Sequence, residues 1–186
     1  MSNQLTRNFG TSRGLVRLGL SYIEAVPLWS AAVRPVPYEV RRLVFVCHGN
    51  ICRSAFAEGV ARDLGIRAAS FGLSTSKGKP AHEPARAAAA KLGHPIEAHL
   101  TTRAQDFVPQ PGDYLLGMEH RHLRKLAALE HLAHQPRGLL GSYTSPPMPH
   151  LHDPYRLDPA FMEVCLRRVG SGVIHLAQAY PGARPG

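Results

Sequence analysis

The stretch "LVFVCHGNICRSAFAEG", residues 43–59, runs from an apolar segment through a short polar loop into a helical pattern. Its continuous apolar start is typical of a strand that is covered on both faces. Ser54 is a residue type that caps helices, so we predict that it caps a helix over residues 55–65. Because ligands bind beyond the carboxyl ends of parallel strands, Cys47, at the end of this strand, marks the expected site.

Strand and helix patterns alternate after this stretch, and their order predicts a parallel sheet between layers of helices. Asp158, followed by a proline, is predicted to cap the last helix. We predict strands over residues 42–47, 67–71, 113–118 and 137–143, and helices over 82–93, 119–133 and 158–180.

Composition indicates an ordinary globular chain of 186 residues, 44% hydrophobic and 19% charged. No segment approaches the ~20 uninterrupted apolar residues of a membrane helix, and the N-terminus does not resemble a secretory signal. Two of the three cysteines lie in one short loop, which is unlike a disulfide scaffold. We therefore expect a reducing, cytoplasmic location.

The formal charge of +9 indicates anionic partners. The basic residues are scattered along the chain and do not cluster with aromatic residues, so we predict no nucleic-acid partner.

Residues 1–40 differ from the rest and are predicted to be an N-terminal extension. They contain an amphipathic helix, interrupted at Pro27, and an extended connector, "RPVPYEV". Such a helix usually packs on its own domain, although residues 11–33 could also contact a second copy or a membrane surface. The apolar residues at helical spacing are Leu15, Val16, Leu18, Leu20, Ile23 and Val26.

The loop after the first strand has the composition of an anion site. Gly49 permits a positive φ and Asn50 tolerates one, so the loop can curl and direct several N–H groups at one point. Arg53 can hold two phosphate oxygens with its planar guanidinium, and the same positive field favours the thiolate of Cys47. Zinc is disfavoured because Cys47 and Cys52 lack the usual two-residue spacing, and no nucleotide-binding Gly-Lys-Ser/Thr follows.

The chain resembles the low-molecular-weight protein-tyrosine-phosphatase family in its bacterial form, from about Leu43 to Tyr180. The resemblance is carried by "VCHGNICRS", "SFGLSTSKGKPA", "EPA", "DYLLGMEHRHLRKL" and "HDPY". It implies a flavodoxin-like or Rossmann-like three-layer sandwich, with a four-stranded parallel sheet of order 2-1-3-4 and helices on both faces. We expect this domain over residues 41–182 and a short tail over 183–186.

The resemblance also implies hydrolysis of phosphotyrosine through a cysteinyl-phosphate, with no metal and no cofactor. Cys47 would be the nucleophile, Arg53 would hold the phosphate, Asp153 would be the general acid and base, and Tyr155 would form the substrate wall. The phosphate-binding loop would comprise His48, Gly49, Asn50, Ile51, Cys52 and Ser54, with Ser54 bonded to the thiolate and Asn50 bracing the backbone.

Other residues are assigned less directly. Asp158 also precedes a proline, but its predicted capping role favours Asp153 as the acid. Cys52 resembles a second loop cysteine that can form a reversible disulfide with the nucleophile, although it could simply pack under the loop. His99 matches a histidine that supports the loop asparagine, within a neighbourhood that departs from the family pattern. Cys165 is expected to be a small core residue.

The histidine pairs His120/His122 and His150/His152 are spaced like ligands but do not form a three- or four-ligand set. We therefore predict no metal site, and we expect His152 to orient the Asp153 loop.

The substrate-facing loop from Ser74 to Lys77 lacks the aromatic residue common in eukaryotic members. Lys77 and Lys79 would favour acidic or multiply phosphorylated tails. The expected partner is a phosphotyrosine protein, for example a bacterial tyrosine kinase that controls exopolysaccharide synthesis, with inorganic phosphate as a product.

Three alternatives stay open. A phosphoarginine phosphatase of the same fold commonly carries threonine where this chain has Ile51. A thiol-coupled arsenate reductase uses further redox cysteines, and only Cys165 remains for that role. A non-catalytic phosphate-binding or membrane-surface adaptor would not need the intact set of Cys47, Arg53 and Asp153.

Overall fold

The computed structural model describes residues 2–24 and 32–185. Its centre is a parallel sheet of four strands in the order β2-β1-β3-β4. The strands are β1 (Arg42–Cys47), β2 (Ala68–Gly72), β3 (Asp113–Gly117) and β4 (Arg137–Leu139). The predicted α/β sandwich and its strand order are confirmed.

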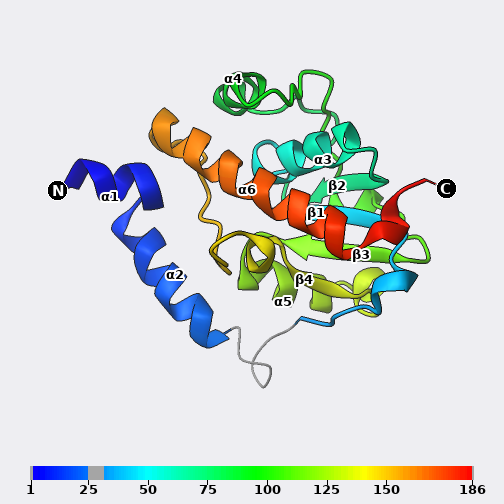
Figure 1. Cartoon of the computed structure of the whole chain (residues 1–186). Coiled ribbons are helices and arrows are strands. Elements are labelled where there is room, and N and C mark those ends of the chain that lie inside the picture. Colours follow the sequence, from blue (N-terminus) through cyan, green and yellow to red (C-terminus); the bar gives the residue numbers. More distant parts are fainter. Residues whose placement is uncertain (1, 25–31, 186) are drawn as a thin grey trace.

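Helices cover both faces of the sheet (Figure 1). On one face Leu43 and Phe45 of β1 pack into a core with α3 (Arg53–Asp63) and α6 (Pro159–Ala179), where α4 (Glu83–Lys91) also lies. On the other face Val44 and Val46 pack against α5 (His120–Ala128). Successive strand residues point to opposite faces, so a strand buried on both sides needs the continuous apolar run seen in β1.

The start of α3 differs from the prediction. The helix begins at Arg53, and its N-cap is Cys52, whose side chain makes no capping bond. The predicted capping role of Ser54 is therefore wrong, because its hydroxyl bonds within the loop. The cap of α6 is confirmed, since Asp158 Oδ1 accepts a hydrogen bond from Ala160 N at 2.7 Å.

Two predicted elements are shorter than expected. β4 ends at Leu139, and Leu140–Tyr143 forms a 3-10 helix in place of the rest of the predicted strand. α5 ends at Ala128, and a separate 3-10 turn covers Glu130–Leu132.

The N-terminal extension forms two helices, α1 (Ser2–Phe9), which the pattern did not predict, and α2 (Ser12–Glu24). Figure 1 shows α1 beside the start of α6, which it contacts, while α2 runs away from that helix. Residues 34–40 are mainly extended, with a short 3-10 turn at Pro37–Glu39. Val26 of the predicted apolar stripe and Pro27, the predicted interruption of the helix, lie outside the described residues.

The face of α2 that packs on the domain is not the predicted apolar stripe. Its buried residues are Gly14, Leu18 and Ser21. Of the predicted stripe, Leu18 is buried, while Leu15, Val16, Leu20 and Ile23 are exposed. Two of the three buried residues are small, which lets α2 lie close against the domain. The contact of residues 11–33 with a second copy or a membrane surface stays a prediction.

Among the described residues, no helix is both long enough and apolar enough to cross a membrane.

Candidate active site

Cys47 ends β1 with its sulfur buried at the start of the loop. Its side chain is 3% exposed. Ser54 Oγ lies 3.0 Å from Cys47 Sγ, and the backbone N–H of Asn50 donates to the same sulfur at 3.2 Å. Hydrogen bonds of this kind stabilise a sulfur anion, because donors at short range favour the charged form.

Asn50 holds the loop in its curled shape. Its φ is +55°, a left-handed conformation that asparagine tolerates better than most residues. The side-chain amide donates to Ser54 Oγ at 2.9 Å and to Ser70 Oγ at 2.8 Å. Its Oδ1 accepts from Thr102 N at 2.9 Å, while His99 Nε2 lies 2.8 Å from the backbone oxygen of Asn50. The structure therefore places His99 beside the loop asparagine.

Several backbone N–H groups of the loop are available to a ligand. No described residue accepts a hydrogen bond from the N–H groups of Gly49, Ile51, Cys52 or Arg53. Unpaired N–H groups in a curled loop at a helix N-terminus form an anion-binding nest. Gly72 permits this curl, because a Cβ there would lie 3.0 Å from the carbonyl carbon of Gly49.

Arg53 is buried under the loop and held by three acceptors. NH1 donates to Glu119 Oε1 at 2.8 Å and to Leu151 O at 2.7 Å. NH2 lies 2.6 Å from Asp153 Oδ2. Burial alone would lower the pKa of Arg53, but Asp153 and Glu119 more than offset it and raise the pKa above its usual value. The guanidinium is therefore a fixed cation at the base of the site.

Glu119 is a residue of the site that the sequence patterns did not identify. Burial alone would raise its pKa, but Arg53, with smaller effects from His122 and Arg121, lowers the pKa well below its usual range. Arg121 also bonds this carboxylate at 2.8 Å. Its position two residues after β3 would have been a usable signal, since side chains that follow parallel strands gather at the same edge of the sheet.

The loop forms the floor of a pocket of about 580 Å³. Asp153 and Tyr155 lie on its wall, and the Tyr155 ring meets the His82 ring edge-on at 4.9 Å between centroids. The lining residues are Cys47, His48, Gly49, Ile51, Cys52, Arg53, Ser74, Thr75, Ser76, Lys79, Pro80, Ala81, His82, Glu83, Arg86, Asp153 and Tyr155. The structure thus brings most of the predicted site residues to one cavity, while Asn50 and Ser54 brace the loop from below.

Two lysines were expected to face the substrate, and the structure separates them. Lys79 lines the pocket, whereas Lys77 is not among the lining residues. Arg86 of α4 lines it as well, and the sequence patterns did not identify that residue. Its Nε is buried without a hydrogen-bond partner among the described residues.

The two candidate acids have separate positions. Asp153 contacts Arg53 on the pocket wall, whereas Asp158 is committed to the cap of α6. This arrangement agrees with the prediction that Asp153, and not Asp158, is the general acid.

The cysteines other than Cys47 are buried free thiols. Burial raises the pKa of Cys52 well above its usual value and raises the pKa of Cys165 to about 12. Cys165 is a buried residue of α6, as expected. The redox role of Cys52 stays a prediction.

The histidine pairs take part in hydrogen bonding. His122 Nδ1 accepts from Met118 N at 3.2 Å, and His152 Nδ1 lies 3.4 Å from His150 Nε2. Within residues 2–24 and 32–185 there is no group of three or more side chains arranged to hold a metal ion.

The sequence matches the family model described as low molecular weight phosphotyrosine protein phosphatase over residues 42–181, most of the chain. The chain belongs to this family. Residues 1–41 lie outside the match, and the predicted domain boundaries themselves stay a prediction.

Curated relatives are bacterial members of the phosphatase family. The low molecular weight protein-tyrosine-phosphatase YfkJ of Bacillus subtilis is 30% identical over 66% of this chain and 85% of its own length. Wzb of Salmonella typhimurium is 32% identical over 62% of this chain and 77% of its own length. Among solved structures, a low molecular weight phosphotyrosine phosphatase of Vibrio cholerae is 25% identical, with a TM-score of 0.65, covering 76% of this chain and 97% of that one.

Proposed function

We propose that this protein hydrolyses phosphotyrosine in proteins through a cysteinyl-phosphate intermediate. The observation that carries the proposal is the convergence of Cys47, Arg53 and Asp153 on one pocket, from the end of β1, the start of α3 and the loop before α6. The family supports the reaction class. Nucleophile, cation and carboxyl group are the groups that such a displacement needs.

In the first step the thiolate of Cys47 attacks phosphorus in line with the leaving oxygen. An S–P bond forms, the P–O bond to the tyrosine breaks, and its electron pair stays on the phenolic oxygen. Asp153 in its protonated form donates a proton to that oxygen. A bound phosphate would take the Arg53 contact that Asp153 makes here, and this exchange would free the carboxyl group for the leaving oxygen.

In the second step water attacks the phosphorus of the cysteinyl-phosphate. Asp153 accepts a proton from the water, the S–P bond breaks, and inorganic phosphate and the Cys47 thiolate are released. The free N–H groups of the loop and the Arg53 guanidinium stabilise the charge on the equatorial oxygens in both steps. The proposed route therefore needs no metal.

The pocket walls favour a protein substrate that is acidic near its phosphotyrosine. Lys79 and Arg86 supply positive charge to one cavity, and Tyr155 supplies an aromatic edge for the substrate ring. The curated relatives include Wzb, and we extend the proposal to a bacterial tyrosine kinase as the substrate and to exopolysaccharide synthesis as the process.

The first test compares phosphotyrosine, phosphoserine and phosphoarginine peptides, each with acidic and with basic flanking residues. We expect phosphotyrosine with acidic flanks to be the best substrate. Cys47→Ser is expected to abolish turnover, and Asp153→Asn to lower kcat by ~10²–10⁴-fold, the usual contribution of a general acid. Phosphate release measures both effects.

Asp158→Asn is the matched control, because asparagine also caps helices and the variant should keep its activity. Full activity of Asp153→Asn together with an inactive Asp158→Asn would overturn the assignment of the acid. Preferential hydrolysis of phosphoarginine or phosphoserine would overturn the proposed substrate.

A further inference from the structure

The N-terminal helices pack on the segment that carries the proposed acid. Gly10 joins α1 to α2 with a φ of +74°, and a Cβ there would lie 2.7 Å from the Phe161 ring of α6. Arg168 of α6 donates to Asn8 O and stacks over the Phe9 ring, 5.5 Å from its centroid. These contacts fix the extension against the first turns of α6.

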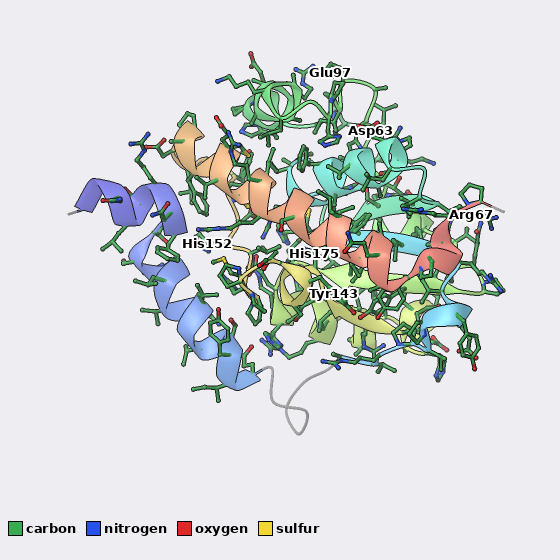
Figure 2. All side chains as sticks on the ribbon, in the orientation of Figure 1. Asp63, Arg67, Glu97, Tyr143, His152 and His175 are labelled. Carbon is green, nitrogen blue, oxygen red and sulfur yellow. The ribbon has the colours of Figure 1, made fainter. Side chains whose placement is uncertain are left out.

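Thr11, the residue that precedes α2, contacts His152, the residue before Asp153. Thr11 Oγ1 lies 3.2 Å from His152 Nε2 and accepts from Gly14 N at 3.0 Å. A Cβ on Gly14 would lie 3.0 Å from the imidazole ring and 2.3 Å from Phe9 O, so glycine is required for this approach. In Figure 2, His152 lies between the N-terminal helices and the rest of the molecule.

Further contacts tie α2 to the same region. Tyr22 OH donates to Pro147 O at 2.7 Å, and His120 Nε2 lies 3.2 Å from Ser21 O. α2 is therefore also attached to Pro147, in the segment that leads to Asp153, and to His120, at the start of α5.

Three consecutive residues, Leu151, His152 and Asp153, contact Arg53 and the N-terminal extension alternately. Leu151 O accepts from Arg53, His152 turns its ring to α2, and Asp153 pairs with Arg53 again. His152 and Asp153 are neighbours in the chain, so one short stretch of backbone carries both the ring that meets Thr11 and the carboxyl group that meets Arg53. The orientation of the His152 ring and that of the Asp153 carboxyl group are therefore coupled through one stretch of backbone.

We propose that α2 acts in cis as a positioning element for the general acid, with Thr11 and His152 as its positioning residues. The inference rests on the proposed function, and nothing in the family match covers this segment, since the match begins at residue 42. By holding His152, α2 limits the positions that Asp153 can take when a substrate displaces it from Arg53.

The expected signature is a dependence on the leaving group. Phenyl phosphate has a basic leaving oxygen that needs a proton in the transition state, whereas p-nitrophenolate leaves without one. A misplaced acid therefore lowers kcat/KM for phenyl phosphate, which reports the first step, and spares kcat/KM for p-nitrophenyl phosphate. The value of kcat is not the readout, because both substrates share the second step, in which Asp153 is the proposed base. General loss of structure would slow both substrates together.

The experiment measures kcat and KM for both substrates with the full chain and its variants. Thr11→Val removes the hydroxyl group at nearly constant size, and with it the contacts to His152 and to Gly14 N. His152→Phe keeps a ring without the nitrogen and leaves the contact between Thr11 and Gly14 N in place. We expect kcat/KM for phenyl phosphate to fall about three- to tenfold in each, as for one lost hydrogen bond. The value for p-nitrophenyl phosphate should stay near wild type. Thr11→Ser keeps the hydroxyl and should restore activity.

Gly19→Ala is the matched control on α2, because the added methyl group would have no atom within 4 Å, and the variant should behave as wild type. Equal kcat/KM values for phenyl phosphate in Thr11→Val, His152→Phe and wild type would overturn the inference, as would an equal loss of kcat/KM with both substrates. Asp153→Asn separates the two claims: if its kcat/KM shows no dependence on the leaving group, the proposed role of Asp153 as the acid is wrong, whatever the variants of Thr11 and His152 show.

Discussion

Arg53 is the residue on which the geometry of the site depends, because it combines almost complete burial with two carboxylate partners. Glu119 and Leu151 O hold NH1 from below, which leaves NH2 for Asp153 in the structure and for a phosphate in the proposed complex. A buried charge without its partners is costly, so the site depends on Glu119 as much as on the loop itself.

Removal of Glu119 is expected to destabilise the protein. Glu119→Ala leaves Arg53 buried with one carboxylate fewer, and such a change typically costs ~3–5 kcal/mol. Glu119→Gln should cost less, because the amide oxygen still accepts a hydrogen bond from Arg53. Urea unfolding measures both, with Glu163→Ala, an exposed partner of Arg167, as the control that should change little. Equal stability of Glu119→Ala and wild type would show that this pair does not hold Arg53.

Elements with strong local patterns could be predicted from the sequence, and elements defined by packing could not. The apolar run of β1 and the Asp-Pro start of α6 are local signals, and the structure confirms both. α2 was predicted as a helix with the wrong packing face, because Gly14 and Ser21 are buried for close approach and not for hydrophobicity.

The same distinction applies to the site. Cys47, Arg53 and Asp153 were identified through their motifs. Glu119 and Arg86 come to the site through the fold. The quoted motifs contain Glu119 and adjoin Arg86, but no site role was predicted for either residue. The capping role of Ser54 was predicted wrongly because its residue type also suits a cap. Its contact with Cys47, which the resemblance implied, depends on the curl of the loop.

At the scale of the whole molecule, buried histidines make the fold sensitive to mild acid. Burial, with Arg53 contributing, lowers the pKa of His122 from 6.5 to about 3. Burial lowers the pKa of His150 to about 4. The unfolded chain therefore takes up protons at these residues below pH 6.5 while the folded protein does not, and the stability present above pH 6.5 is lost as the pH falls.

We expect the free energy of unfolding to fall by about 1.4 kcal/mol per pH unit for each histidine that stays neutral only in the folded state. Between pH 6.5 and 4.5 the buried histidines should dominate, since Glu119 contributes only below its unfolded pKa of 4.5. Urea unfolding across this window measures the slope. His122→Gln should reduce the slope of the unfolding free energy against pH, whereas His134→Gln, at an exposed histidine, should leave that slope unchanged. A slope unchanged in His122→Gln would contradict this expectation.

The central claim is that the sulfur of Cys47 carries the phosphoryl group between the two chemical steps. Acid quenching of Asp153→Asn during turnover of p-nitrophenyl phosphate, followed by mass spectrometry of its peptides, tests it directly, because the first step then needs no acid while the second still lacks its base. We predict a phosphoryl group on Cys47. Product formation without any phosphorylated Cys47, or with the phosphoryl group on another residue, would contradict the claim.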